Sequence, residues 1–181
     1  MVADAAAKHG LMIAFEPLAL RRGAAVSTLP ETIEVLDRAG RDNIQILLDV
    51  WHSWPEPDLL ANLKSCVGRL IGVQINDVRN PERSWCDRVM PGDGRNVCTP
   101  IVPALIQAGF TGWYDFEVFS DDGRWGNDFA DSLWKLPHGE FVARDTTLLR
   151  ASTKTERGWL HPATCRRAWS SERREGSERP D

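Results

Sequence analysis

The chain has 181 residues, which is enough for one domain with a substantial core. Its net charge of −4 gives no general electrostatic attraction to nucleic acid or to an anionic membrane. No apolar run approaches the ~18 residues that cross a bilayer, and residues 1–10 lack the pattern of a secretory signal. The four cysteines form no CxxC pair, which indicates reduced thiols in a cytoplasmic protein.

Predicted strands and helices alternate along the chain after a first helix that ends near Gly10. The strands are short apolar runs, and the helices combine an apolar face with a cap or a glycine stop, as between Thr28 and Gly40. In chain order the expected elements are a strand at 11–17, a helix at 28–40, a strand at 44–50, a helix at 55–68, a strand at 70–77, a long polar loop at 79–96, a helix at 100–109, a strand at 112–119 and a helical pattern at 126–150.

Strands that are apolar on both faces indicate a parallel sheet covered by helices. The expected fold is therefore α/β, with one domain of successive strand–helix units over residues 1–150. The polar ends of neighbouring strands are 33, 25 and 43 residues apart, which suits such units with one long loop. Residues 151–181 have little apolar periodicity, so we expect a disordered polar tail there.

Each predicted strand closes on a polar side chain that is able to bind a metal. These residues are Glu16, Asp49, Gln74 and Glu117. In parallel α/β sheets ligands bind at the C-terminal strand ends, so we expect these side chains to converge. Their oxygen atoms favour a hard cation, best Mn²⁺ or Mg²⁺, with Co²⁺ or Zn²⁺ as alternatives. Asp77, three residues after Gln74, is expected to be a loop carboxylate instead.

A divalent ion with open positions would act as a Lewis acid on a substrate carbonyl and stabilise an enediolate. Glu16 and Glu117 would then flank the substrate as acid and base. Ordinary structural roles compete with this interpretation. A single strand-end carboxylate is more often a loop hydrogen-bond partner, His52 also suits a packed core, and Gln74 alone suits a structural amide. Arg88 is either a solvated charge or a residue that the following glycine-rich turn brings over the strand ends.

The motifs FEPL, LLDVWHSW, GVQINDV, DRVMPGDG and GWYDFEVFSDDG occur in this order over about residues 10–145. In this order they resemble the second half of the sugar phosphate isomerase/epimerase family, which has the xylose isomerase-like TIM barrel. The resemblance implies that the four strand-end residues are metal ligands and that His52 and Arg88 contact the substrate. The implied activity is metal-dependent isomerisation or epimerisation of a keto-sugar or sugar phosphate. Many ketose epimerases of the family have His where Gln74 stands, and glutamine there is similar to some 3-dehydroshikimate dehydratases.

A full barrel needs eight strand–helix units and typically ~250 residues, whereas the resemblance covers the last four units. Such a half barrel exposes two sheet edges and an open interior, so we expect a homodimer or association with a missing N-terminal half. A dehydratase-like lyase and an inactive truncated fragment are the alternative functions. Nucleic-acid repair is disfavoured, because endonuclease IV shares the fold but needs a His-rich cluster, and only His52 lies at a strand end. The expected partner is therefore a small carbohydrate-like molecule, with no nucleic acid and no membrane.

Overall fold

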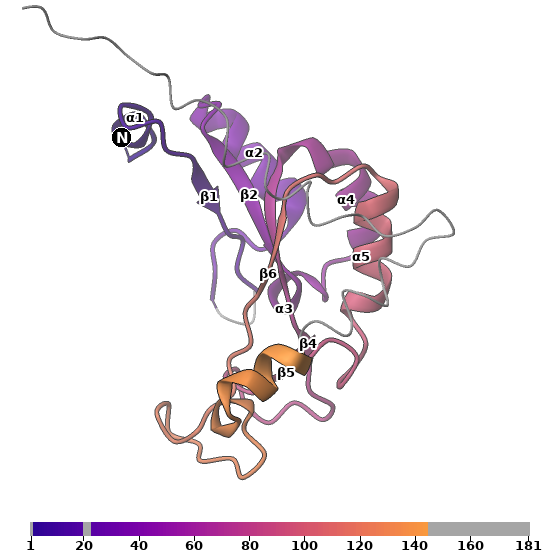
Figure 1. The fold of residues 1–181 in the computed structure, drawn as a ribbon. Coiled ribbons are helices and arrows are strands. Elements are labelled where there is room, and N and C mark those ends of the chain that lie inside the picture. The colour runs from indigo at the N-terminus through magenta and orange to yellow at the C-terminus, as the bar shows by residue number, and fades with distance from the viewer. Residues whose placement is uncertain (1, 20–22, 145–181) are drawn as a thin grey trace, which may run out of the picture.

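The computed structural model describes residues 2–19 and 23–144, and its centre is a sheet of four parallel strands (Figure 1). The strands lie side by side in chain order, and each is parallel to the next. They are β1 (Ile13–Phe15), β2 (Ile44–Asp49), β3 (Leu70–Ile75) and β6 (Trp113–Phe116). This order is that of consecutive units in a parallel barrel, so the predicted α/β fold of half-barrel type is confirmed.

Three helices cover one side of this sheet, as Figure 1 shows for α2 (Leu29–Ala39), α4 (Leu59–Cys66) and α5 (Cys98–Gln107). Alternate strand residues point to that side because side chains along a strand alternate between faces. They pack with one face of each helix into the main core, whose most buried members include Leu29, Leu36, Ile46, Leu48, Leu63, Val73, Ile75, Ile101 and Leu105. The structure confirms the predicted helix cover for this side of the sheet.

Local capping signals define α2 as the sequence predicts. The Thr28 hydroxyl accepts from the backbone N–H of Glu31, while the Glu31 carboxylate accepts from the N–H of Thr28. This reciprocal pair satisfies backbone donors that the first helical turn leaves without a partner. Gly40 ends the helix in a left-handed conformation with φ 58°, and its N–H returns to the carbonyls of Leu36 and Asp37.

The expectation that all four strands are apolar on both faces is wrong for the two edge strands. β2 and β3 are largely buried, but β1 and β6 alternate between partly buried and exposed residues. Ala14, Trp113 and Asp115 are exposed on the sheet face that carries no helices. Trp113 covers Gly72 on this face, since a Cβ at Gly72 would lie 2.4 Å from the Trp113 ring. These residues are exposed because β1 and β6 are the edge strands of the sheet. Which strands lie at the edge depends on the order of the whole sheet.

The loop predicted at 79–96 is more ordered than its polar sequence indicates. β4 (Asp77–Val78) pairs antiparallel with β5 (Arg88–Val89), and residues 86–91 are buried. The fully buried carboxylate of Asp77 accepts from the N–H groups of Val78, Gly92 and Asn96, as well as from Val97. Asp77 is thus the loop carboxylate that the sequence predicts, and it closes the glycine-rich turn.

The helical pattern predicted at 126–150 is wrong for its first half. Residues 121–132 form turns, in which the Asp121 carboxylate accepts from the N–H groups of Gly123, Trp125 and Asn127. A 3₁₀ turn, η3 (Leu133–Lys135), follows, and helix appears only at 138–144, after Pro137. Carboxylate-bound turns compete with helix for the same backbone donors. Residues 145–150 and the predicted tail at 151–181 lie outside the described residues.

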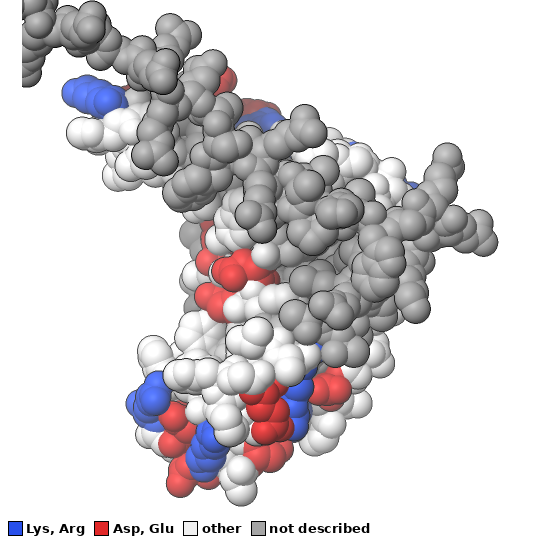
Figure 2. All heavy atoms as spheres, viewed as in Figure 1, with Lys and Arg blue, Asp and Glu red and all other residues white. Residues whose placement is uncertain are grey.

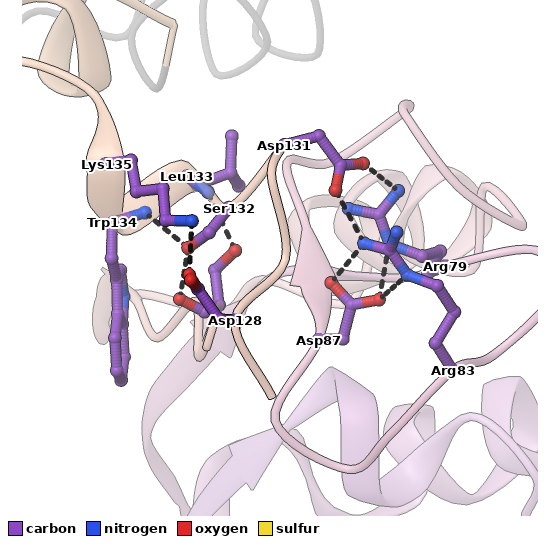
Figure 3. A network of polar contacts seen from close by, with 10 residues as sticks. Arg79, Arg83, Asp87, Asp128, Asp131, Ser132, Leu133, Trp134 and Lys135 are labelled. Carbon is purple, nitrogen blue, oxygen red and sulfur yellow. Dashed lines mark hydrogen bonds and ion pairs between the residues drawn. The ribbon is translucent and has the colours of Figure 1, made fainter. Parts of the chain in front are cut away.

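Four charged side chains join this C-terminal segment to the loop before β5 (Figure 3). Arg79 and Arg83 both pair with the buried carboxylate of Asp87 and with Asp131, at distances of 2.5–3.2 Å. Because Asp87 is fully buried, two arginines beside it compensate its lost hydration. The network fixes the residue directly before Arg88. Three short elements complete the described fold, α1 (Val2–Ala7), α3 (Val50–Ser53) and η2 (Val67–Arg69).

None of the helices in residues 2–19 and 23–144 is both long and apolar enough to cross a bilayer. Of the four cysteines, Cys66, Cys86 and Cys98 are free and buried, and burial raises the pKa of each thiol above its usual value.

Candidate metal centre

The four strand-end residues singled out from the sequence lie at one end of the sheet. Asp49 and Gln74 are register partners at the ends of β2 and β3, while Glu16 and Glu117 directly follow β1 and β6. The exposed face of the same region collects negative charge, since acidic side chains gather at the narrow middle of the molecule in Figure 2. Parallel strands in register bring these ends together, as the alternation of elements predicts.

Asp49 is held by the short helix that follows its own strand. The residue is the N-cap of α3, and its Oδ1 accepts from the N–H of Trp51 at 2.9 Å. The helix of four residues places His52 three positions on, facing back over the strand ends. His52 Nε2 lies 3.7 Å from Glu16 Oε1 and 3.7 Å from Asp49 Oδ2. The motif DVWH is thus one turn that places Asp49 and His52 beside each other.

The ring nitrogens of His52 have different partners, which decides what the imidazole can do. Nδ1 accepts a hydrogen bond from the backbone N–H of Ala19 at 3.0 Å. In the neutral imidazole the proton therefore sits on Nε2, which points at the carboxylates of Glu16 and Asp49. Together these three residues offer atoms within 4.8 Å of one another. A protonated Nε2 is a hydrogen-bond donor and has no lone pair for a metal, so His52 in this tautomer donates a hydrogen bond and does not ligate an ion.

Arg88 reaches the centre because the folded loop and β5 carry it there. Its backbone N–H donates to the carbonyl of Phe119 at 2.7 Å, and its side chain is only 3% exposed. Nη1 donates to Asp49 Oδ2 at 2.8 Å and to Glu117 Oε2 at 2.9 Å. The guanidinium also lies 4.9 Å from the ring centroids of Trp51 and Phe119. Of the two alternatives that the sequence left open, the solvated charge is wrong.

Burial and crowding of like charges change the acidity of the two glutamates. Burial is the main reason that the pKa of Glu16 rises to about 7, with the negative charges of Asp49 and Glu117 adding to it and Arg88 opposing it. Burial likewise raises the pKa of Glu117, where the Arg88 guanidinium opposes the shift and Asp49 adds to it. Carboxyl groups poised near neutral pH are suited to give and take protons.

The surroundings of the Gln74 side chain show whether this set of donor atoms fits a cation. Its side chain is 7% exposed, and its Oε1 is buried with no hydrogen-bond partner among the residues that the structure describes. A buried carbonyl oxygen without a partner is costly, by about 1–3 kcal/mol. A hard cation among Gln74 Oε1 and three carboxylates would satisfy this oxygen and neutralise the like charges. The donor set therefore fits a divalent metal, although the individual ligand roles remain predictions.

The sequence did not reveal every polar residue of the centre. Asn76 is fully buried, and its Nδ2 donates to Asp49 Oδ1 at 2.7 Å and to the carbonyl of Glu117 at 3.2 Å. The only sequence signal was its position directly after a predicted strand, within the motif QIND. Phe119 was also missed as a wall beside Arg88, because an aromatic residue after a strand is ordinarily part of a core.

Two curated relatives resemble this chain over part of their length. An inosose dehydratase of Salmonella agona is 27% identical over 128 residues, which cover 62% of this chain and 42% of that protein. An inosose isomerase of Bacillus subtilis is 27% identical over 122 residues, which cover 65% of this chain and 44% of that protein. The chain therefore spans less than half the length of these relatives.

Solved structures share the fold over about half of their own chains. A protein of Sinorhizobium meliloti has a TM-score of 0.68 at 28% identity, covering 79% of this chain and 50% of that one. The IolI protein, solved with a zinc atom, has a TM-score of 0.66 at 23% identity, covering 83% and 51%. D-psicose 3-epimerase of Clostridium cellulolyticum has a TM-score of 0.60 at 19% identity, covering 77% and 47%. The last two likenesses concern the fold alone.

The sequence profile of one family matches residues 1–137, which is most of the chain and includes all the strand ends described above. The order of the motifs, the parallel sheet and this match all indicate the same family. The chain belongs to the xylose isomerase-like TIM barrel family.

Proposed function

We propose that the chain supplies the metal-binding half of a divalent-metal-dependent isomerase or epimerase. Its substrate would be a polyhydroxy ketone, either an open-chain keto-sugar or sugar phosphate or a cyclic inosose of the kind named for the curated relatives. The observation that carries the proposal is the convergence of Glu16, Asp49 and Glu117 on one strand-end region, beside the unsatisfied Oε1 of Gln74.

Four side chains would hold the metal, and the two glutamates among them would also carry protons. A divalent ion held by Glu16, Asp49, Gln74 and Glu117 would polarise a substrate carbonyl. The hydrogen on the adjacent carbon would then be more acidic. The remaining steps belong to the protein. One glutamate removes the proton next to the carbonyl, and the other returns a proton to the neighbouring carbon or oxygen. In the metal-free protein burial raises the pKa of Glu16 to about 7, and a bound cation would favour its ionised form, which is able to accept a proton.

Two further groups would bind and orient the substrate. His52 directs its Nε2–H into the centre, because its Nδ1 is engaged by the Ala19 N–H. Arg88, held between Trp51 and Phe119, supplies a fixed positive charge beside Asp49 and Glu117. A hydroxyl or carbonyl oxygen of the substrate would accept from these donors, which places the reacting carbon near the glutamates.

A dehydratase-like lyase is the second candidate, because Gln74 stands where many ketose epimerases have His and because one curated relative is an inosose dehydratase. Both reactions begin with removal of the proton next to the carbonyl. They differ in the second step, since the lyase expels a hydroxyl group as water and the epimerase returns a proton to carbon. An inactive chain is the third possibility, and in that case neither reaction would be observed.

The deciding experiment has two arms, metal binding and proton exchange. Isothermal titration with Mn²⁺ compares the wild type with Asp49→Asn and with Asp42→Asn, an exposed acid just before β2, at the opposite end of the strand that Asp49 closes. We expect Asp49→Asn to weaken binding at least tenfold and Asp42→Asn to leave it unchanged. Equal loss in both variants, or no binding by the wild type, would contradict the proposed centre.

In the second arm, keto-sugars, inososes and 3-dehydroshikimate are incubated with metal-loaded protein in D₂O and followed by proton NMR. Loss of the signal next to the carbonyl indicates proton removal, and the product then separates the candidates. An epimer or isomer supports the first proposal, a product that has lost one water supports the lyase, and no exchange with any substrate supports an inactive chain.

A further inference from the structure

Asn76 is the one fully buried neutral side chain that joins three neighbouring strand ends within the described residues. It follows β3 directly, and its Nδ2 donates to Asp49 Oδ1 at the end of β2 at 2.7 Å. The same nitrogen donates to the backbone carbonyl of Glu117 at the end of β6 at 3.2 Å. Its two donor hydrogens therefore go to two residues of the proposed metal centre.

The two oxygens of Asp49 consequently face different surroundings. Oδ1 accepts from Asn76 Nδ2 at 2.7 Å and from the N–H of Trp51 at 2.9 Å. A carboxylate oxygen has two in-plane lone pairs, so both of those on Oδ1 are in use. Oδ2 faces the centre, where it meets Arg88 Nη1 at 2.8 Å and lies 3.7 Å from His52 Nε2. Only Oδ2 keeps a lone pair directed at the place where a cation would bind.

A role in stability alone does not account for an asparagine here. The Oδ1 of Asn76 is buried and has no hydrogen-bond partner among the described residues. A buried unpaired amide oxygen destabilises a protein by about 1–3 kcal/mol, whereas an apolar residue of the same shape carries no such cost. The position therefore uses the donor hydrogens of the amide, and those hydrogens go to Asp49 and Glu117.

We propose that Asn76 is a positioning residue, which holds Asp49 Oδ1 so that Asp49 offers a metal one oxygen, Oδ2, and not two. The inference rests on the metal centre proposed above and adds a residue and a binding mode to it. Outer partners of ligating carboxylates commonly contribute 10–100-fold to metal affinity, because they fix the direction of the ligating oxygen. In the absence of Asn76, Oδ1 would accept only from the Trp51 N–H and would regain a lone pair for a metal, so the carboxylate could bind through both oxygens.

The test uses Asn76→Leu, which keeps nearly the same shape and removes the donor. Its matched control is Asn43→Leu, because Asn43 also donates through Nδ2, to the carbonyls of Ala3 and Leu11 at the opposite end of the sheet. Each protein is loaded with Co²⁺, its visible absorption spectrum is recorded, and its affinity is measured by titration. Infrared difference spectra report whether a carboxylate binds through one oxygen or two.

We expect Asn76→Leu to bind Co²⁺ about 10–100-fold more weakly, with a changed visible spectrum and a new two-oxygen carboxylate band. Asn43→Leu should keep the wild-type spectrum and affinity even where it lowers the melting temperature. A spectrum and affinity in Asn76→Leu that equal those of the wild type would overturn the inference while leaving the metal centre standing.

A metal-free measurement separates this failure from failure of the centre itself. In the wild-type protein with EDTA, the Asn76 side-chain amide protons should be shifted downfield and exchange slowly with solvent. Absence of that signature would overturn the inference whatever the metal does. Failure of both the wild type and Asn43→Leu to bind Co²⁺, with the signature present, would overturn the proposed centre and leave Asn76 a structural residue.

Discussion

Replacing Glu16 with glutamine should remove most of the pH dependence of metal binding. The pKa of this carboxyl is raised from 4.5 to about 7, first by burial and then by the charges of Asp49 and Glu117. A cation that binds Glu16 must displace its proton whenever the pH lies below that value. The metal and the proton therefore compete across the range in which the protein would work.

The size of the effect follows from the fraction ionised. With a pKa of about 7, Glu16 is about 3% ionised at pH 5.5 and about 76% ionised at pH 7.5. The affinity for Mn²⁺ should thus rise about 25-fold between these values, which corresponds to about 2 kcal/mol. With an ordinary pKa of 4.5, the same change of pH would alter affinity by only about 10%.

Isothermal titration at pH 5.5, 6.5 and 7.5, each in two buffers of different ionisation enthalpy, measures both the affinity and the protons released. We expect close to one proton released from Glu16 at pH 5.5 and about 0.2 at pH 7.5. Glu16→Gln should lose this release, and any slope that remains is assigned with Glu117→Gln, whose pKa is also raised. Equal affinity of the wild type at pH 5.5 and 7.5, or an unchanged slope in Glu16→Gln, would refute the reasoning.

The same shift predicts how the metal-free protein responds to pH. Because the folded pKa exceeds the unfolded one, the contribution of Glu16 to stability is complete below pH 4.5 and is lost as the pH rises through 7. The loss is at most about 3 kcal/mol. In EDTA, Glu16→Gln should therefore be less sensitive than the wild type to a change from pH 5 to pH 8 in urea unfolding.

Three further predictions concern catalysis, a helix cap and association. Glu117→Gln keeps one coordinating oxygen and loses the base, so turnover should fall ~10²-fold or more while Mn²⁺ affinity weakens only modestly; near-normal turnover at saturating metal would make Glu16 the proton carrier. Thr28→Ala removes the capping box of α2 and should lower the free energy of unfolding by about 1 kcal/mol, as urea titration would show; no change would mean that another group caps the helix. The outer edges of β1 and β6 and the open sheet face should drive self-association or binding of a complementary half, so sedimentation of a monomer with a cooperative melt would contradict this.

Much of the fold was predictable because its signals are local. An apolar run of strand length, bounded by turns, predicts β2 or β3 without knowledge of any partner. The Thr28 box and Gly40 define α2 through residues within one helical turn. The strand-end positions of Asp49 and Gln74 followed from the same local periods, since each closes an apolar run.

Two of the failed predictions involve partners that are distant in the sequence, and one involves a carboxylate just before the segment. The first half of the helical pattern at 126–150 gave way to turns, which the Asp121 carboxylate stabilises by accepting from the N–H groups of Gly123, Trp125 and Asn127. The polar loop at 79–96 contains β5 because residue 88 pairs with residue 78 and with the carbonyl of Phe119. The exposure of alternate residues in β1 and β6 depends on their edge position in the sheet.

The sequence by itself determined the succession of strands and helices and the four polar residues that close the strands, because hydrophobic period and capping act over a few residues. Only the tertiary structure decided that Arg88 bridges Asp49 and Glu117, that Asn76 occupies one oxygen of Asp49, and that Glu16 has a pKa of about 7. These properties depend on burial and on charges brought together from distant parts of the chain. No local pattern encodes them, since desolvation and charge–charge interaction depend on distance in space and not on separation in sequence.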